Sequence, residues 1–105
     1  MNFIQGTLDI LILRSLSDEP RHGYDVVAWI HRVTQGEVRV VDAALYTSLH
    51  RMENRGWLRA EWRGSEKARR AKYYRLTPRG KKQLAAGEQK WSRFSTAVAR
   101  LFAGG

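Results

Sequence analysis

The residues of this chain best suited to chemistry are its clustered cations, which are suited to binding phosphate. Positions 63 to 82 contain nine lysines and arginines and only one acid, Glu66. This fifth of the 105-residue chain therefore carries eight of the nine net positive charges. A concentrated basic patch on a folded domain indicates a polyanionic partner, with nucleic acid the first expectation and an acidic membrane the second. The alternative is a charged turn that is simply solvated.

The centre of this cluster is predicted to form the tip of a β-hairpin. The stretch WLRAEWRG (57–64) alternates apolar and charged positions, which is typical of a strand with one buried face made of Leu58, Ala60 and Trp62. The stretch AKYYRLT (71–77) would return with Tyr74 and Leu76 facing inward. The cations expected to contact DNA phosphate at or beside the tip are Lys67, Arg69, Arg70 and Lys72.

A short amphipathic helix is predicted to begin after Asp42 and to end at Gly56. Leu45, Leu49 and Met52 recur at helical spacing and would face the core. Small residues at the start of the outward face would allow close approach to base edges in a major groove, and the polar ones could donate or accept hydrogen bonds. By itself this face could be merely solvated, but the basic hairpin beside it favours DNA contact. The DNA-contact candidates of this helix are Ala43, Ala44, Tyr46, Thr47, His50, Arg51 and Asn54.

Two further helices are expected nearer the N-terminus. Thr7 is a candidate N-cap for the first, which is apolar nearly all round and therefore predicted to be buried on more than one face. The second is expected over residues 22–34, with Tyr24, Val27 and Ile30 turned inward. The order helix, helix, turn, helix, hairpin indicates a winged helix-turn-helix, a fold that is mainly α with a small β-hairpin.

The last helix is predicted to begin at Thr77-Pro78, an N-cap followed by proline, and to reach about residue 102. Apolar residues recur along it seven apart, as in a coiled-coil seam. This helix either folds back onto its own core or, as we expect, joins the first helix in a two-fold dimer interface. Residues 1–77 would thus form the DNA-binding domain and 78–105 a dimerisation helix of the same unit. The predicted interface residues are Leu8, Ile12, Leu84, Trp91, Phe94, Val98 and Leu101.

Several other functions find no support in the sequence. Cysteine is absent, the three histidines (His22, His31 and His50) lack metal-ligand spacing, and no glycine-rich phosphate loop or catalytic constellation is present. We therefore expect no enzyme activity, no metal and no cofactor. The N-terminus lacks an export signal, which predicts a cytoplasmic protein with no membrane partner. Trp91 is read first as seam packing and second as a platform for an aromatic ligand between subunits.

The chain resembles the PadR family of transcriptional regulators. The resemblance is carried in order by GTLDILIL (6–13), PRHGYDV (20–26), ALYTSLHRMENRGWL (44–58) and RRAKYYRLTPRG (69–80). The length is similar to the short class of the family, which implies a homodimer built by the first and last helices. It also implies repression through an inverted-repeat operator, and in some relatives a response to aromatic molecules, for which WSRF (91–94) resembles the binding position. Thr47 departs from the proline of many relatives, and the tip SEKARRAK lacks their glycine.

The leading hypothesis is therefore a dimeric, sequence-specific repressor that binds double-stranded DNA and is relieved by an aromatic small-molecule effector. The alternative is a winged-helix interaction module that uses its basic hairpin on RNA or on an acidic protein. The two differ in a measurable way, because only the first predicts a preference for one duplex sequence over excess non-specific competitor.

Overall fold

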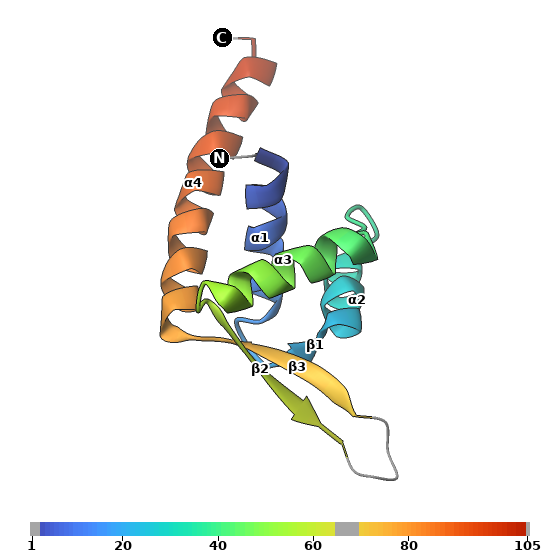
Figure 1. The fold of residues 1–105 in the computed structure, drawn as a ribbon. Coiled ribbons are helices and arrows are strands. Elements are labelled where there is room, and N and C mark those ends of the chain that lie inside the picture. Colours follow the sequence, from blue (N-terminus) through green and yellow to red (C-terminus); the bar gives the residue numbers. More distant parts are fainter. Residues whose placement is uncertain (1–2, 65–69, 105) are drawn as a thin grey trace.

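A computed structural model of the chain describes residues 3–64 and 70–104, which form four helices and a small sheet (Figure 1). The elements follow one another as α1 (Phe3–Ser15), β1 (Arg21–His22), α2 (Gly23–Val33), α3 (Asp42–Asn54), β2 (Leu58–Arg63), β3 (Ala71–Leu76) and α4 (Pro78–Phe102). The β2–β3 hairpin projects from one end of the molecule, and α4 extends past α1 toward the other end (Figure 1). The predicted winged-helix arrangement, mainly α with a small hairpin, is confirmed.

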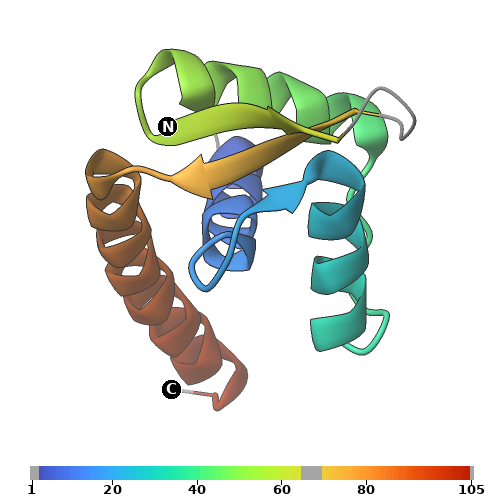
Figure 2. The ribbon, with the colours of Figure 1, turned by 90° about the horizontal axis from the view of Figure 1, so that it is seen from below.

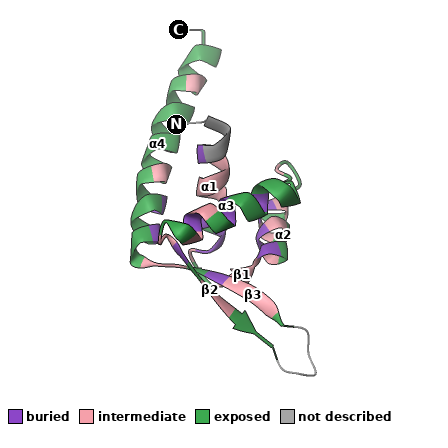
Figure 3. Ribbon diagram, in the orientation of Figure 1, coloured by how far each residue is buried: buried purple, intermediate pink, exposed green. Residues whose placement is uncertain are grey.

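The core lies where α1, α2 and α3 meet the base of the hairpin, and α4 adds to it only through its first turns (Figure 3). Burial of these apolar side chains is the main favourable contribution to folding, since each is worth roughly 1.5–3 kcal/mol. The buried apolar residues are Ile12, Leu13, Leu16, Val26, Ile30, Leu45, Leu49, Met52, Leu58, Tyr74 and Leu84.

The sheet is antiparallel in the order β1-β3-β2 (Figure 2). In the hairpin Leu58 lies opposite Leu76 and Ala60 opposite Tyr74, so the predicted inner faces of both strands meet. The strand β1 was not predicted, because two residues carry no periodic pattern. It pairs Arg21 with Tyr74 and thereby joins the start of α2 to the hairpin.

Three sequence predictions about helix faces and ends were wrong. Helix α1 begins at Phe3, so Thr7 lies inside it and does not cap it. The buried stripe of α2 is Val26 and Ile30, while the ring of Tyr24 is 74% exposed. The N-cap of α3 is Val41, and Asp42 is instead the first helical residue, where a carboxylate favours the positive end of the helix dipole.

The junction between hairpin and α4 is as predicted. The Thr77 hydroxyl accepts a hydrogen bond from the amide of Gly80 (3.0 Å) and donates one to the carbonyl of Gly56 (2.6 Å), and Pro78 is the first helical residue. Gly56 has φ +78°, the left-handed conformation that ends a helix and that glycine adopts without strain. One threonine thus ties the end of α3, the hairpin and α4 together.

Two predicted interface residues belong to the protomer's own core. Ile12 is fully buried, and Leu84, in the same core cluster, is only 8% exposed. Neither can reach a second chain. The surface left for a partner lies further along α4, where Trp91, Phe94 and Leu101 are 44%, 46% and 76% exposed.

Candidate nucleic-acid interface

Helix α3 presents a continuous outward face because Leu45, Leu49 and Met52 anchor its opposite side in the core. The face begins with Ala43, so the first turn offers little steric obstruction to a base edge. Ala44 is also exposed, but it lies toward α1 and lines an apolar pocket there. Farther along it offers hydroxyl, imidazole and amide groups. The predicted contact residues of α3 that are exposed are Ala43, Ala44, Tyr46, Thr47, His50 and Asn54.

Arg51 does not lie on that face. Its guanidinium donates to the carboxylate of Asp9 in α1 at 2.6 Å, and the two side chains are only 20% and 13% exposed. An arginine held in a largely buried ion pair is not available to read a base, because its departure would leave the carboxylate of Asp9 buried without that counter-charge. The expected outward position of Arg51 is therefore corrected, and its place is between α1 and α3.

The hairpin formed by β2 and β3 is the wing. Its cations differ in whether they are exposed or bonded to other side chains. Arg70 is exposed immediately before β3. Lys72 donates to the carboxylate of Glu53 in α3 at 3.2 Å and lies over the ring of Tyr74. Burial opposes its charge, but the hydrogen bonds to Glu53 and Tyr74 outweigh this, so the pKa of Lys72 lies above its usual value. Lys72 thus braces the wing against α3, while Lys67 and Arg69 lie outside the described residues.

A hollow of about 530 Å³ separates α3 from the wing and extends to the start of α2. Aromatic rings and cationic groups share its lining. Sequence reasoning assigned no binding role to His22, and it placed both Tyr24 and Trp62 inward. Trp62 is in fact 58% exposed, because β2 has already left the core at that point. The hollow is lined by His22, Gly23, Tyr24, Tyr46, His50, Trp62, Arg70, Ala71, Lys72 and Tyr74.

The start of α2 is fixed against α3 by two local features. His22 caps the helix, since its Nδ1 accepts from the amide of Asp25 at 3.3 Å. The ring of Tyr46 lies so close to Gly23 that an added Cβ there would be 2.9 Å from it. Glycine at this position therefore allows the phenol of α3 to pack on the backbone of α2, and the two helices of the helix-turn-helix keep one relative orientation.

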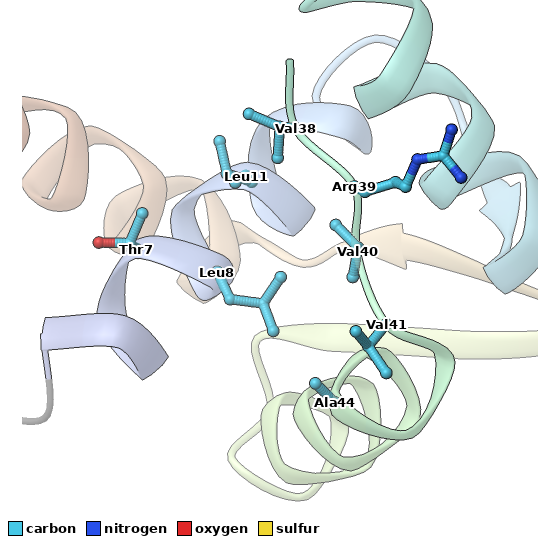
Figure 4. A pocket seen from close by; sticks show the side chains of 8 residues that line it. All are labelled: Thr7, Leu8, Leu11, Val38, Arg39, Val40, Val41 and Ala44. Atoms are coloured by element: carbon cyan, nitrogen blue, oxygen red, sulfur yellow. The ribbon is translucent and has the colours of Figure 1, made fainter. Parts of the chain in front are cut away.

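A second surface lies on the far side of α1. An apolar pocket of about 310 Å³ opens between α1, the α2–α3 connection and the start of α3 (Figure 4). Leu8 and Leu11 line it from α1, and Val38, Val40 and Val41 line it from the connection.

On α4, the rings of Trp91 and Phe94 lie 6.0 Å apart and Val98 is half-buried. Of the predicted interface residues, Leu8, Trp91, Phe94, Val98 and Leu101 therefore remain at least partly accessible.

Across the described parts of the chain, no three histidine, aspartate or glutamate side chains come together as a metal site would require. Within the same residues, no helix combines the length and the apolar character needed to cross a membrane.

Comparison with known proteins agrees with this geometry. Residues 12–86 match the model of the "Transcriptional regulator PadR-like family". A transcriptional regulator from Clostridium thermocellum is 26% identical, with a TM-score of 0.84 over 95% of this chain and 97% of that one. A PadR family transcription regulator from Clostridium difficile R20291 is 32% identical, with a TM-score of 0.72 over 91% and 97% of the two chains. A PadR-like regulator from Bacillus cereus is 26% identical, with a TM-score of 0.78 over 97% of each. The chain belongs to the PadR-like family of transcriptional regulators and is not an enzyme.

Proposed function

We propose that this protein is a repressor that binds a specific duplex DNA sequence as a homodimer. The observation that carries the proposal is the exposed face of α3 beside the cationic wing. The side chains of this face are small at the start of the helix and polar beyond it. A helix of this kind fits a major groove of about 12 Å, and exposed arginines beside it, such as Arg70, suit the flanking phosphates. In this arrangement Thr47, His50 and Asn54 read base edges, while the wing supplies affinity and orientation.

A two-fold dimer would present two such helices to an inverted-repeat operator. The proposed interface combines α1 with the accessible seam of α4, namely Leu8, Trp91, Phe94, Val98 and Leu101. Support comes from the exposure of apolar side chains on a 25-residue helix whose outer part has little core to pack on. To meet successive major grooves, the two α3 helices must lie roughly 34 Å apart.

We further propose that an aromatic effector relieves repression by binding at Trp91, near the two-fold axis. The supporting observation is that Trp91 and Phe94 form a pair of tilted rings that is about half exposed on the protomer. Flat aromatic molecules stack well on such exposed rings. Titration of the dimer with a panel of planar aromatic compounds tests this: quenching of tryptophan fluorescence that is absent in Trp91→Leu supports it, and no quenching by any compound overturns it.

The DNA-binding proposal is tested with the DNA upstream of the protein's own gene. The expected result is a shifted band that survives excess non-specific competitor and maps to a palindrome. Substitution of Thr47, His50 or Asn54 by alanine should change the preferred base at one position of each half-site, as selection from a randomised operator would show. Equal affinity for duplex DNA, RNA and heparin would instead favour an interaction module for RNA or an acidic protein.

A further inference from the structure

We propose that the hollow between α3 and the wing seats a sugar–phosphate segment of the DNA strand, with Trp62 as its apolar platform. The proposal rests on the DNA binding proposed above and assigns a role to residues that the sequence placed elsewhere. It concerns the DNA backbone beside the major groove that α3 is proposed to enter.

The exposure of Trp62 is the first observation. Leu58, Ala60 and Trp62 share one face of β2, and along it the residues pass from buried through half-buried to 58% exposed. The strand thus carries its apolar face beyond the core and ends it on a large indole. Trp62 is not isolated, because the exposed rings of Tyr24 and Tyr46 line the same hollow, and a group of exposed aromatic rings is characteristic of a contact surface.

The lining of the hollow is the second observation. Tyr46 forms one wall and is held there by its contact with the backbone of Gly23. Tyr24, 74% exposed, lies at another edge, and Arg70 is exposed at the wing side. A DNA strand alternates apolar deoxyribose with anionic phosphate. A hollow that combines aromatic rings with a cation is complementary to both parts of that repeat, whereas base edges would find better partners on the outward face of α3.

The cations around the hollow differ in whether they already interact with another side chain. Lys72 lies opposite Trp62 in the sheet, but its ammonium is already paired with Glu53. Arg63 lies over Tyr73, whose side chain points to the opposite face of β3 from Lys72 and Tyr74. Of the described cations that line the hollow, Arg70 is therefore the one we assign to the phosphate, and Trp62 is assigned to the sugar. The two contacts differ in their dependence on salt, since only an ionic contact releases counterions.

This difference gives the test. With the full-length dimer and its operator, Trp62→Ala should lower affinity by roughly tenfold, as expected for a tryptophan anchor. The loss should be the same on scrambled DNA, the slope of log affinity against log salt should be unchanged, and Trp62→Phe should restore most of the binding. Arg70→Ala should instead reduce the magnitude of that slope by about 0.9 for each protomer.

Two controls keep the result interpretable. Glu61→Ala changes the neighbouring residue on the opposite face of β2 and should bind DNA no more weakly than the unaltered protein. Hydroxyl-radical footprinting should show a protected run of sugars on one strand that Trp62→Phe retains and Trp62→Ala loses. If Trp62→Ala does not fold, the comparison is made between the unaltered protein and Trp62→His.

Unaltered affinity and sugar protection in a folded Trp62 variant would overturn the inference and leave the proposed function standing. A loss confined to the operator, with scrambled DNA unaffected, would also overturn it, because it would make Trp62 a base reader. Failure of the unaltered protein to bind any duplex is a different outcome, since it would contradict the proposed function itself.

Discussion

At the scale of single residues, the most informative position is Arg51. Its sequence context suggested a base contact, and the structure shows an ion pair with Asp9, 42 positions earlier in the chain. The pair joins α1 to α3 where both side chains are largely buried. Arg51 therefore fixes the position of α3, and its influence on DNA binding should be indirect.

Neutralising either partner of this pair should have the same effect. We expect Asp9→Asn and Arg51→Gln each to lower the free energy of unfolding by about 3 kcal/mol, because each breaks an ion pair between two largely buried side chains. Urea unfolding of both variants and of the double variant would measure the coupling between them. Both single variants should bind the operator more weakly without changing its preferred sequence. A changed preference at one base pair in Arg51→Gln, absent in Asp9→Asn, would restore Arg51 as a reader.

At the scale of elements, the wing and α4 are joined with very little space between them. A Cβ added to Gly80, in the first turn of α4, would lie 2.1 Å from the carbonyl oxygen of Trp57. Farther along α4, a Cβ on Gly87 would lie 2.7 Å from the side chain of Ile10. A backbone carbonyl moves less easily than a side chain, so Gly80 should tolerate substitution by alanine less well than Gly87.

Gly80→Ala should therefore destabilise the protein by roughly 1–3 kcal/mol, as overpacking does, even though alanine favours a helix by up to about 1 kcal/mol. Gly87→Ala gains the same helix propensity, and rotation of the Ile10 side chain can relieve its contact, so its loss should be less than half as large. Thermal or urea unfolding of the pair provides the comparison. Equal stability of the two variants would contradict the rigid junction.

The elements also show what the sequence could and could not predict. The α3 helix, the hairpin and the Thr77-Pro78 junction followed from local signals, namely apolar spacing, strand alternation and capping chemistry. The strand β1 did not, because its two residues are defined by their partner strand. The Asp9–Arg51 pair and the exposure of Tyr24 and Trp62 depend on how elements pack, and residue types along one chain do not specify which neighbour arrives there. Two of the four cations predicted to contact phosphate, Lys67 and Arg69, lie outside the described residues and stay predictions.

At the scale of the whole molecule, the protomer is elongated, with extents of 61 × 29 × 23 Å, because α4 continues well past the core. The proposed dimer accounts for that length. Its interface lies on accessible residues of α4, so disrupting it should leave each protomer folded.

Leu101→Asp should raise the dimer dissociation constant by more than roughly tenfold, since burying an unpaired carboxylate costs several kcal/mol. The side chain is 76% exposed in the protomer, so helix content should not change. Thr96→Asp, exposed on the other side of α4, is the matched control and should stay dimeric. Sedimentation equilibrium and circular dichroism distinguish the outcomes, and a Leu101→Asp protein that remains fully dimeric would exclude this end of α4 from the interface.

One consequence concerns the single residue, Thr77, between β3 and α4. Its hydroxyl group is hydrogen-bonded to Gly56 and Gly80, and its amide to the carbonyl of Trp57. A longer or shorter connection would break these bonds, so the hairpin and α4 are rigidly joined. In the proposed dimer, the separation of operator half-sites is then determined by how the two α4 helices cross. A substitution that alters this crossing should therefore change the preferred separation of half-sites, even though it lies far from the residues proposed to touch DNA.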